Sequence, residues 1–257
     1  MTVIHSTAIV GDGAELGEGV EVGPYSVIGT HVTIGDGSRI MPHVVLDGWT
    51  RIGSKCTIFP FASIGTQTQD LKYRGGKSFV EIGDRTTIRE YVTVNSGTEE
   101  GEVTRVGADC FLMAYTHVAH ACELKNGVIM ANCATLAGHI VVEDQVIIGG
   151  LTAVHQFVNI GRLCILGGCT KVTKDCPPFT TIDGNPAKVR GLNSVGLKRK
   201  NIDAQAQKLL KQAYRVLYRE NLSTQQALKK IHATIEKCPE LDYLLSFIEK
   251  SERGIIK

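Results

Sequence analysis

Aliphatic side chains recur at every sixth position of this sequence from Ile4 to Val172, and of the 29 positions in that phase 26 are aliphatic or methionine. A period of six fits neither the 3.6-residue period of an amphipathic helix nor the two-residue alternation of a half-buried strand. It fits a triangular coil in which each flat side is a short strand that points one aliphatic side chain inward. We therefore expect a mainly β protein, a left-handed parallel β-helix of about ten coils whose neighbouring strands lie about 4.8 Å apart.

Three hexads complete one coil, so residues 18 positions apart should stack in neighbouring coils. Three positions break the phase: Asp70, Gly76 and Glu100. The first two lie in a polar, glycine-containing stretch near 67–79, and the third lies near 96–104. Loops that interrupt a solenoid usually lie on its working face. We therefore expect two loops there that mark the functional side.

The repeat ends after Val172, at Cys176-Pro177-Pro178, and an expected linker follows. The apolar spacing then becomes helical. Three helices are expected there, one from about Asp203 to Glu220, one opened by the capping box at Ser223 and running to about Lys237, and one opened by Pro239. The predicted organisation is a β-helix over 1–190 and a small C-terminal α-helical domain over 191–257.

Charge is unevenly placed along the chain. The net charge is only +2, but the segment from Gly196 onward holds 13 basic and seven acidic residues. Such a basic end indicates either an acidic partner or phosphate ligand, or simply a solvated helix surface. The sequence shows no P-loop or GxGxxG outside the repeat, and no basic, aromatic stripe that would indicate nucleic-acid binding.

The cysteines and the N-terminus bear on the compartment. None of the eight cysteines forms a CxxC pair, so we expect free, mostly buried thiols in a reducing cytosol. No apolar run is long enough to cross a bilayer, and the N-terminus does not resemble a signal peptide. The expectation is a cytoplasmic protein without stable membrane insertion and without a cofactor.

Histidines are the best candidates for chemistry. His120 lies two residues after the inward-pointing Val118, so it should face outward at a turn. Adding 18 twice gives Gly138 and Gln156, which predicts a column of a histidine, a glycine and a glutamine. His139 and His155 flank that column.

This column suits acyl transfer. A neutral imidazole can take a proton from an attacking hydroxyl or amine. A glycine N–H one coil away can stabilise the developing oxyanion, and the missing side chain lets a carbonyl approach the backbone. The alternatives are surface histidines without a role, and a zinc site shared between chains of a trimer, although no cysteine or carboxylate pattern completes one.

The repeat, together with Asp183-Gly184-Asn185-Pro186-Ala187, resembles the hexapeptide-repeat acyltransferase superfamily. Within it, the chain resembles the family of acyl-carrier-protein:UDP-N-acetylglucosamine O-acyltransferases of lipid A biosynthesis, over essentially its whole length. The segments that carry the resemblance are Gln69-Asp70-Leu71-Lys72-Tyr73, Ile88-Arg89-Glu90, His117-Val118-Ala119-His120, Leu136-Ala137-Gly138-His139, Gly149 to Phe157, and Gly196-Leu197-Lys198-Arg199.

The resemblance implies roles for individual residues. His120 matches the general base, Gly138 the backbone oxyanion donor, and Asp70 a supporting carboxylate. Gly168 matches the position that sets acyl-chain length, and a glycine there implies a long 3-hydroxyacyl group. The resemblance also implies a homotrimer, a UDP-sugar substrate and acyl carrier protein as partner. The implied substrate-binding residues are Gln69, Lys72, His117, His139, His155, Gln156, Asn193, Arg199 and Lys200, the last two as a basic pair near phosphate or the carrier protein.

Two positions depart from the family pattern. Asn95 stands where a histidine is common, and Val195 where an acidic residue is common. Both would lie near the sugar nucleotide, so transfer to a 3-amino sugar stays an alternative. A related hexapeptide N-acyltransferase, an acetyl-CoA-dependent acetyltransferase and a non-catalytic β-helix are further alternatives. The N-acyltransferase usually carries an N-terminal uridine-binding domain, whereas the repeat here begins at Ile4, and the basic end favours an acidic protein over coenzyme A.

Overall fold

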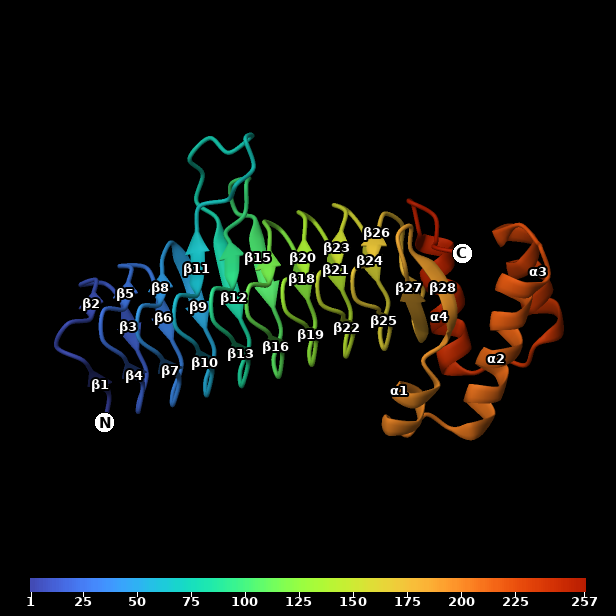
Figure 1. Ribbon diagram of the computed structural model, residues 1–257, viewed down its shortest axis with the longest axis horizontal. Helices are drawn as coiled ribbons and strands as arrows, with labels where there is room; N and C mark the ends of the chain where they lie inside the picture. The colour runs from blue at the N-terminus through green and yellow to red at the C-terminus, as the bar shows by residue number, and fades with distance from the viewer.

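The computed structural model describes residues 1–257. Figure 1 shows a long stack of coils with a group of helices at its C-terminal end. Three sheets run along the stack, and every strand pairing within it up to β27 is parallel. The chain visits sheets A, B and C in turn, so the coil has an A–B, a B–C and a C–A corner. The predicted parallel β-helix is present.

The strands are short, mostly two residues long, because each carries only one hexad. Sheet A contains β1 (Val3–Ile4), β4 (Glu21–Val22), β7 (Arg39–Ile40), β10 (Thr57–Ile58), β13 (Thr87–Ile88), β16 (Phe111–Leu112), β19 (Ile129–Met130), β22 (Ile147–Ile148), β25 (Ile165–Leu166), β27 (Thr180–Asp183) and β28 (Lys188–Leu192). Sheet B contains β2 (Ile9–Val10), β5 (Val27–Ile28), β8 (Val45–Leu46), β11 (Ser63–Thr66), β14 (Thr93–Asn95), β17 (His117–Val118), β20 (Thr135–Leu136), β23 (Ala153–Val154) and β26 (Lys171–Val172). Sheet C contains β3 (Glu15–Leu16), β6 (Thr33–Ile34), β9 (Trp49–Ile52), β12 (Phe79–Ile82), β15 (Val103–Val106), β18 (Glu123–Leu124), β21 (Val141–Val142) and β24 (Asn159–Ile160).

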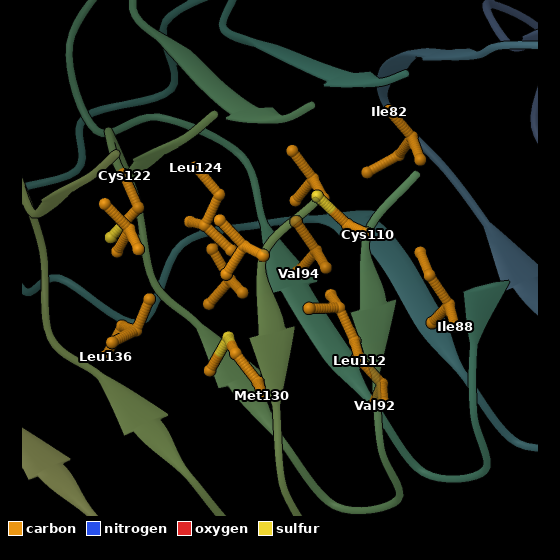
Figure 2. Close-up of a cluster of buried hydrophobic side chains, with 14 of the residues drawn as sticks. Ile82, Ile88, Val92, Val94, Cys110, Leu112, Cys122, Leu124, Met130 and Leu136 are labelled. Atoms are coloured by element: carbon orange, nitrogen blue, oxygen red, sulfur yellow. The ribbon is translucent and has the colours of Figure 1, made fainter. Parts of the chain in front are cut away.

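The aliphatic hexad positions fill the interior of the coil. Figure 2 shows Ile88, Leu112 and Met130 of sheet A pointing toward side chains of the other two sheets. Their side chains are fully buried, as are the small residues near the corners, such as Ser26 and Cys56. Burial of this apolar surface is what holds the coils together.

The register explains where the two loops come from. Thr57 pairs with Thr87, and their separation along the chain exceeds 18 residues by two hexads. Thr87 pairs with Phe111, and that separation exceeds 18 residues by one hexad. The extra residues form loop 1, between β11 and β12 (67–78), and loop 2, between β14 and β15 (96–102). Both loops project from the same side of the stack (Figure 1). The structure thus has both interruptions that the broken hexads predict.

The C-terminal region differs in part from the prediction. The expected linker contains β27, which continues sheet A beside β25, and β28, which pairs antiparallel with β27. A short helix, α1 (Ser194–Arg199), was not anticipated. The remaining helices lie where the sequence indicates, although α3 ends three residues early, at Thr234: α2 (Ala204–Arg219), α3 (Thr224–Thr234) and α4 (Pro239–Lys250).

Local contacts explain these helix positions. Asp203 caps α2, Ser223 and Gln226 form the predicted capping box of α3, and Pro239 occupies the first turn of α4. Asp175, almost fully buried, accepts hydrogen bonds from Asn159 N at 2.8 Å and Ser251 Oγ at 2.6 Å, which ties the end of α4 to the last coil. None of the four helices has the length and apolar character needed to cross a membrane.

The eight cysteines are free, as the sequence predicts, and five of them are buried. Cys169, at the A–B corner, is exposed.

Replacing Leu112 by alanine should lower the free energy of unfolding by about 2–5 kcal/mol, because the rigid coil cannot collapse around the cavity. Denaturant unfolding at one fixed protein concentration measures this. The control is Arg39→Ala, which breaks an ion pair with Glu21 whose side chains are both more than half exposed, and should cost less than about 1 kcal/mol. A Leu112→Ala cost as small as the control's would contradict the packed interior.

Candidate active site

His120 and Gly138 meet at the B–C corner, as the 18-residue period predicts. Strands β17 and β20 pair His117 with Thr135, so the turn residues that follow them stack in the same register. A Cβ built on Gly138 would overlap the Cε1 and Nε2 atoms of the His120 ring. The absence of a side chain at Gly138 therefore lets the imidazole lie close against the next coil.

The backbone N–H of Gly138 donates no hydrogen bond within the chain, whereas the neighbouring His139 N–H donates to His120 O at 3.0 Å. Gly138 is buried among its neighbours, and its Cα lies against the His120 ring. The corner thus offers a proton acceptor and an uncommitted N–H donor side by side.

Loop 1 brings Asp70 to this corner. Its Oδ2 lies 3.7 Å from His120 Nε2, while its Oδ1 accepts from the backbone N–H of Lys72 at 3.0 Å. Thr68 and Thr98, both buried, hold the loop: Thr68 Oγ1 accepts from Asp70 N at 3.1 Å, and Thr98 Oγ1 donates to Asp70 Oδ2 at 3.4 Å. The hydrogen bond from Lys72 N–H, together with the nearby His120, lowers the pKa of Asp70, so this carboxyl is ionised at neutral pH.

The surroundings of His120 keep it uncharged. Its side chain is only 12% exposed, and its Nδ1 is buried without a hydrogen-bond partner among the protein atoms. Burial lowers the pKa of the imidazole, and His139 and Lys72 lower it further, whereas Asp70 and Glu102 raise it. The net pKa lies below that of a free histidine, so the ring is neutral at pH 7 and can accept a proton.

His117 lies in β17 of sheet B, just before the turn that carries His120. Its Nδ1 is 2.7 Å from Thr93 Oγ1, which fixes the ring orientation. Burial, with a smaller effect of His120, lowers the pKa of His117 as well. This ring therefore adds no positive charge to the corner at neutral pH.

His139 directly follows Gly138 at the B–C corner. Its ring stacks on Phe157 with centroids 4.7 Å apart, and meets the His120 ring edge to face at 4.9 Å. Nδ1 of His139 lies 3.7 Å from Oε1 of Glu102, a loop 2 residue. His120, Gly138, Asp70 and His139 thus form one cluster. The 18-residue period predicts the positions of the two histidines and the glycine, whereas Asp70 is implied there only by the family resemblance.

Other predicted residues border this cluster. Gln156 and His155 are exposed one coil further on, and Arg253 reaches His155 Nδ1 at 3.5 Å. Gln69 is exposed, and its amide N–H donates to Asn95 Oδ1 at 3.5 Å. The Asn95 side chain itself is only 5% exposed and donates to Thr66 and Gln67. Asn95 therefore fastens the start of loop 1 and does not present a free amide to a sugar.

A second group of predicted residues lies on sheet A, away from His120. A groove of about 830 Å³ runs over Phe111, Ile129 and Ile147 and reaches Lys200 at the end of α1. Gly168 is exposed at the A–B corner, just after β25. Within one chain the structure does not bring this group together with His120.

Asn193 and Val195 flank the start of α1. Asn193 is buried, and its side chain accepts from Gly196 N and donates to Leu163 O, so it caps the helix. The substrate-binding role expected for it stays a prediction. Val195 is 59% exposed.

Comparison with known proteins shows which family has this sequence and fold. Residues 175–256 match a family described as UDP-N-acetylglucosamine O-acyltransferase, domain 2, and residues 14–48 match the bacterial transferase hexapeptide repeat. The acyl-[acyl-carrier-protein]--UDP-N-acetylglucosamine O-acyltransferases of Herminiimonas arsenicoxydans and Thermodesulfovibrio yellowstonii are each 48% identical over the full length of both chains. The chain belongs to this acyltransferase family.

Solved structures agree with the assignment to this acyltransferase family. The UDP-N-acetylglucosamine acyltransferase of Bacteroides fragilis superimposes with a TM-score of 0.96 at 39% identity, over 99% of this chain and 100% of that one. The corresponding enzyme of Acinetobacter baumannii gives 0.95 at 39% identity over the same shares. The predicted left-handed parallel β-helix with C-terminal helices is confirmed.

Sequence reasoning missed two residues of this candidate site. Glu102 and Thr98, both of loop 2, contact His139 and Asp70 respectively. The only signal for them was the broken hexad at Glu100, which located the loop without showing which of its side chains turn inward. No group of three His, Cys, Asp or Glu side chains within the chain is arranged to hold a metal ion.

The charges around His120 give a signed test. Asp70→Asn should lower the pKa of His120 below its wild-type value, because a stabilising negative charge is lost, and Lys72→Ala should raise it. NMR titration of the His120 ring measures both. Asp242→Asn, on the exposed face of α4, is the matched control and should leave the titration unchanged. A rise in the Asp70→Asn variant would contradict the geometry.

Proposed function

We propose that this acyltransferase moves a 3-hydroxyacyl chain from acyl carrier protein to the 3-hydroxyl of UDP-N-acetylglucosamine, the first step of lipid A biosynthesis. The observation that carries the proposal is the pairing of a neutral imidazole with an uncommitted backbone N–H, His120 against Gly138. The names of relatives 48% identical over the whole chain support the substrates. They are named as O-acyltransferases, so they do not favour a 3-amino acceptor.

The proposed reaction uses the imidazole of His120 and the backbone N–H of Gly138. The neutral imidazole of His120 takes the proton of the sugar 3-hydroxyl as the oxygen attacks the thioester carbonyl. The carbonyl oxygen becomes an oxyanion that accepts a hydrogen bond from Gly138 N–H. The tetrahedral intermediate then expels the thiol of the carrier's prosthetic group, which receives the proton held by His120, and the ester remains on the sugar. Asp70 holds the imidazole and stabilises its charged form during these steps.

The sugar nucleotide would lie along the B–C corner. Polar side chains there follow the corner in both directions from His120, with Gln69 and Lys72 on loop 1 and His139, His155 and Gln156 on the coils beyond. Lys72 and Arg253 supply positive charge for a diphosphate. His117, held by Thr93, forms the floor next to the base.

The acyl chain would lie in the sheet A groove. Its floor includes the apolar side chains of Phe111, Ile129 and Ile147. These residues pair in register along the sheet, and the column continues beyond the groove to Ile165. Gly168 lies at the A–B corner beyond this column, where a side chain would shorten the space. This arrangement supports the chain-length role implied by the family resemblance.

The separation of the two groups supports the homotrimer that the family resemblance implies. His120 lies on the B–C corner, and Gly168 with the sheet A groove lies on another side of the same coil. One groove can use both only if sheet A of one chain faces the B–C corner of another. The A–B corner carries a ladder of stacked rings, including the exposed Phe61, Tyr91 and Tyr115, which is apolar surface suited to burial between copies.

The basic C-terminal helices would receive the acidic carrier protein. The segment from Gly196 onward is net positive, and Arg199 and Lys200 stand at the end of α1, where Lys200 lines the groove. Charge complementarity would guide the carrier to the groove that receives its acyl chain. The eight free cysteines support a reducing, cytoplasmic setting.

Replacing His120 by alanine should reduce turnover by at least about 10³-fold, because the reaction loses its general base. The assay uses purified 3-hydroxyacyl carrier protein and UDP-N-acetylglucosamine, with product identified by mass spectrometry. His232→Ala removes a surface histidine paired with Glu249 on α4 and should keep full activity. Comparable activity in the His120→Ala variant would exclude this residue as the base.

Replacing Gly168 by methionine should shift the preferred substrate to a shorter acyl chain. The nearest atom to a Cβ at this position is Gly150 O at 3.3 Å, so the variant should fold with only a small adjustment. Competition among carrier proteins loaded with chains of different length measures the shift. Gly191→Ala, which adds a methyl group in open space, is the control. An unchanged chain-length profile would show that Gly168 does not limit the groove.

A further inference from the structure

Loop 2 is built around the carboxylate of Glu102. Its Oε2 accepts from the backbone N–H groups of Thr98 at 2.6 Å and Glu99 at 3.3 Å. Gly97 packs so closely that a Cβ there would lie 2.6 Å from Glu102 Cβ. The Glu102 side chain is only 18% exposed although it ends in a carboxyl group. The loop therefore folds over this carboxylate and carries it inward.

The other oxygen of Glu102 faces the site. Oε1 lies 3.7 Å from Nδ1 of His139, an ion-pair separation that is longer than a hydrogen bond. Catalytic contacts of this kind often tighten when substrate binds. Phe157 stacks on the His139 ring and His120 meets the ring edge to face. The carboxylate lies at Nδ1, so Nε2 of His139, which forms no hydrogen bond within the chain, is the ring nitrogen left for a ligand.

Thr98 links the contact between Glu102 and His139 to the contact between Asp70 and His120. Its backbone N–H binds Glu102, and its hydroxyl donates to Asp70 Oδ2 at 3.4 Å. The two interrupting loops thus deliver one carboxylate to each of two histidines, Asp70 to His120 and Glu102 to His139. The side chains of Glu99 and Glu100, in the same loop, are exposed, and that of Glu99 forms no hydrogen bond within the chain.

We propose that Glu102 is a positioning residue for acceptor binding, which fixes the proton of His139 on Nδ1 and presents its Nε2 as a hydrogen-bond acceptor to the sugar. The identity of the bound sugar in this inference rests on the proposed function. The orientation of His139 rests only on the contacts of Glu102. A sugar hydroxyl or amide N–H is the donor that such a nitrogen would receive. The site then has one imidazole that takes the proton of the attacking hydroxyl and a second that holds the sugar beside it.

The negative charge of Glu102 also acts on the base. The charged and titratable groups around His120 are Asp70 and Lys72 from loop 1, Glu102 from loop 2, His117 from β17 and His139 from the corner. Glu102 raises the pKa of His120, so its neutralisation lowers that pKa. The acid limb of kcat/KM, where the base becomes protonated, then moves to lower pH.

The test is Glu102→Gln, which keeps an oxygen for the loop N–H groups and removes the charge. Glu99→Gln, in the same loop, is the matched control. We expect Glu102→Gln to lower kcat/KM by about tenfold, mainly through a higher KM for UDP-N-acetylglucosamine, and to shift the acid limb downward, while Glu99→Gln changes neither. In a His139→Asn background, Glu102→Gln should add almost no further loss of kcat/KM, because the two residues act through one contact.

A direct readout separates this inference from the proposed function. In alkaline buffer, ¹⁵N NMR of the His139 ring should show the proton on Nδ1 in the wild-type chain, and a loss of that preference in Glu102→Gln but not in Glu99→Gln. A wild-type proton on Nε2, or a tautomer unchanged by Glu102→Gln, overturns the inference whatever the activity. Additive losses in the double variant also overturn it. An inactive wild-type enzyme with the expected NMR result would instead count against the proposed substrates.

Discussion

The structure depends on one repeated interaction, the parallel pairing of strands 18 residues apart around an interior filled by one aliphatic side chain per hexad. The inward side chains fix the register, because a slip of one residue would turn every aliphatic outward. The register in turn fixes the corners, so that turn residues of successive coils lie directly over one another. The stacking of His120 on Gly138 is a consequence of core packing rather than a separately built feature.

The active corner combines this rigid stack with two irregular loops. The coil supplies the imidazoles and the backbone N–H, whose positions follow from the core. The loops supply the carboxylates, and they are held by each other: Lys77 N–H donates to Glu100 and Gly101 N–H donates to Lys77 O. Burial lowers the pKa of His120 and so favours its neutral form, whereas the nearby carboxylates of Asp70 and Glu102 raise that pKa. In the proposed reaction, this balance keeps His120 neutral at rest and able to hold a proton.

The hexad pattern predicts much of this from sequence. It locates the coils, the two loops and the His120 column, because each of these follows from counting residues. It does not predict that Asp70 reaches His120 or that Glu102 reaches His139, since the loops have no period and their shape depends on contacts such as Thr98 with Asp70. Asn95 shows the same limit, because its departure from the family pattern suggests a sugar contact, whereas its amide is used to fasten loop 1. The strands β27 and β28 were missed because Pro177 and Pro178 indicate the end of a repeat, although sheet A continues beyond them.

A crystal structure of the chain with UDP-N-acetylglucosamine bound tests the central claim most directly. The account predicts the sugar at the B–C corner, with its 3-hydroxyl oxygen within hydrogen-bond distance of the imidazole of His120 and with Gly138 N–H facing the space beside it. It also predicts three copies of the chain, with sheet A of one beside the B–C corner of the next. A sugar bound on another face of the coil, with His120 more than a hydrogen bond away from its 3-hydroxyl, would contradict the account.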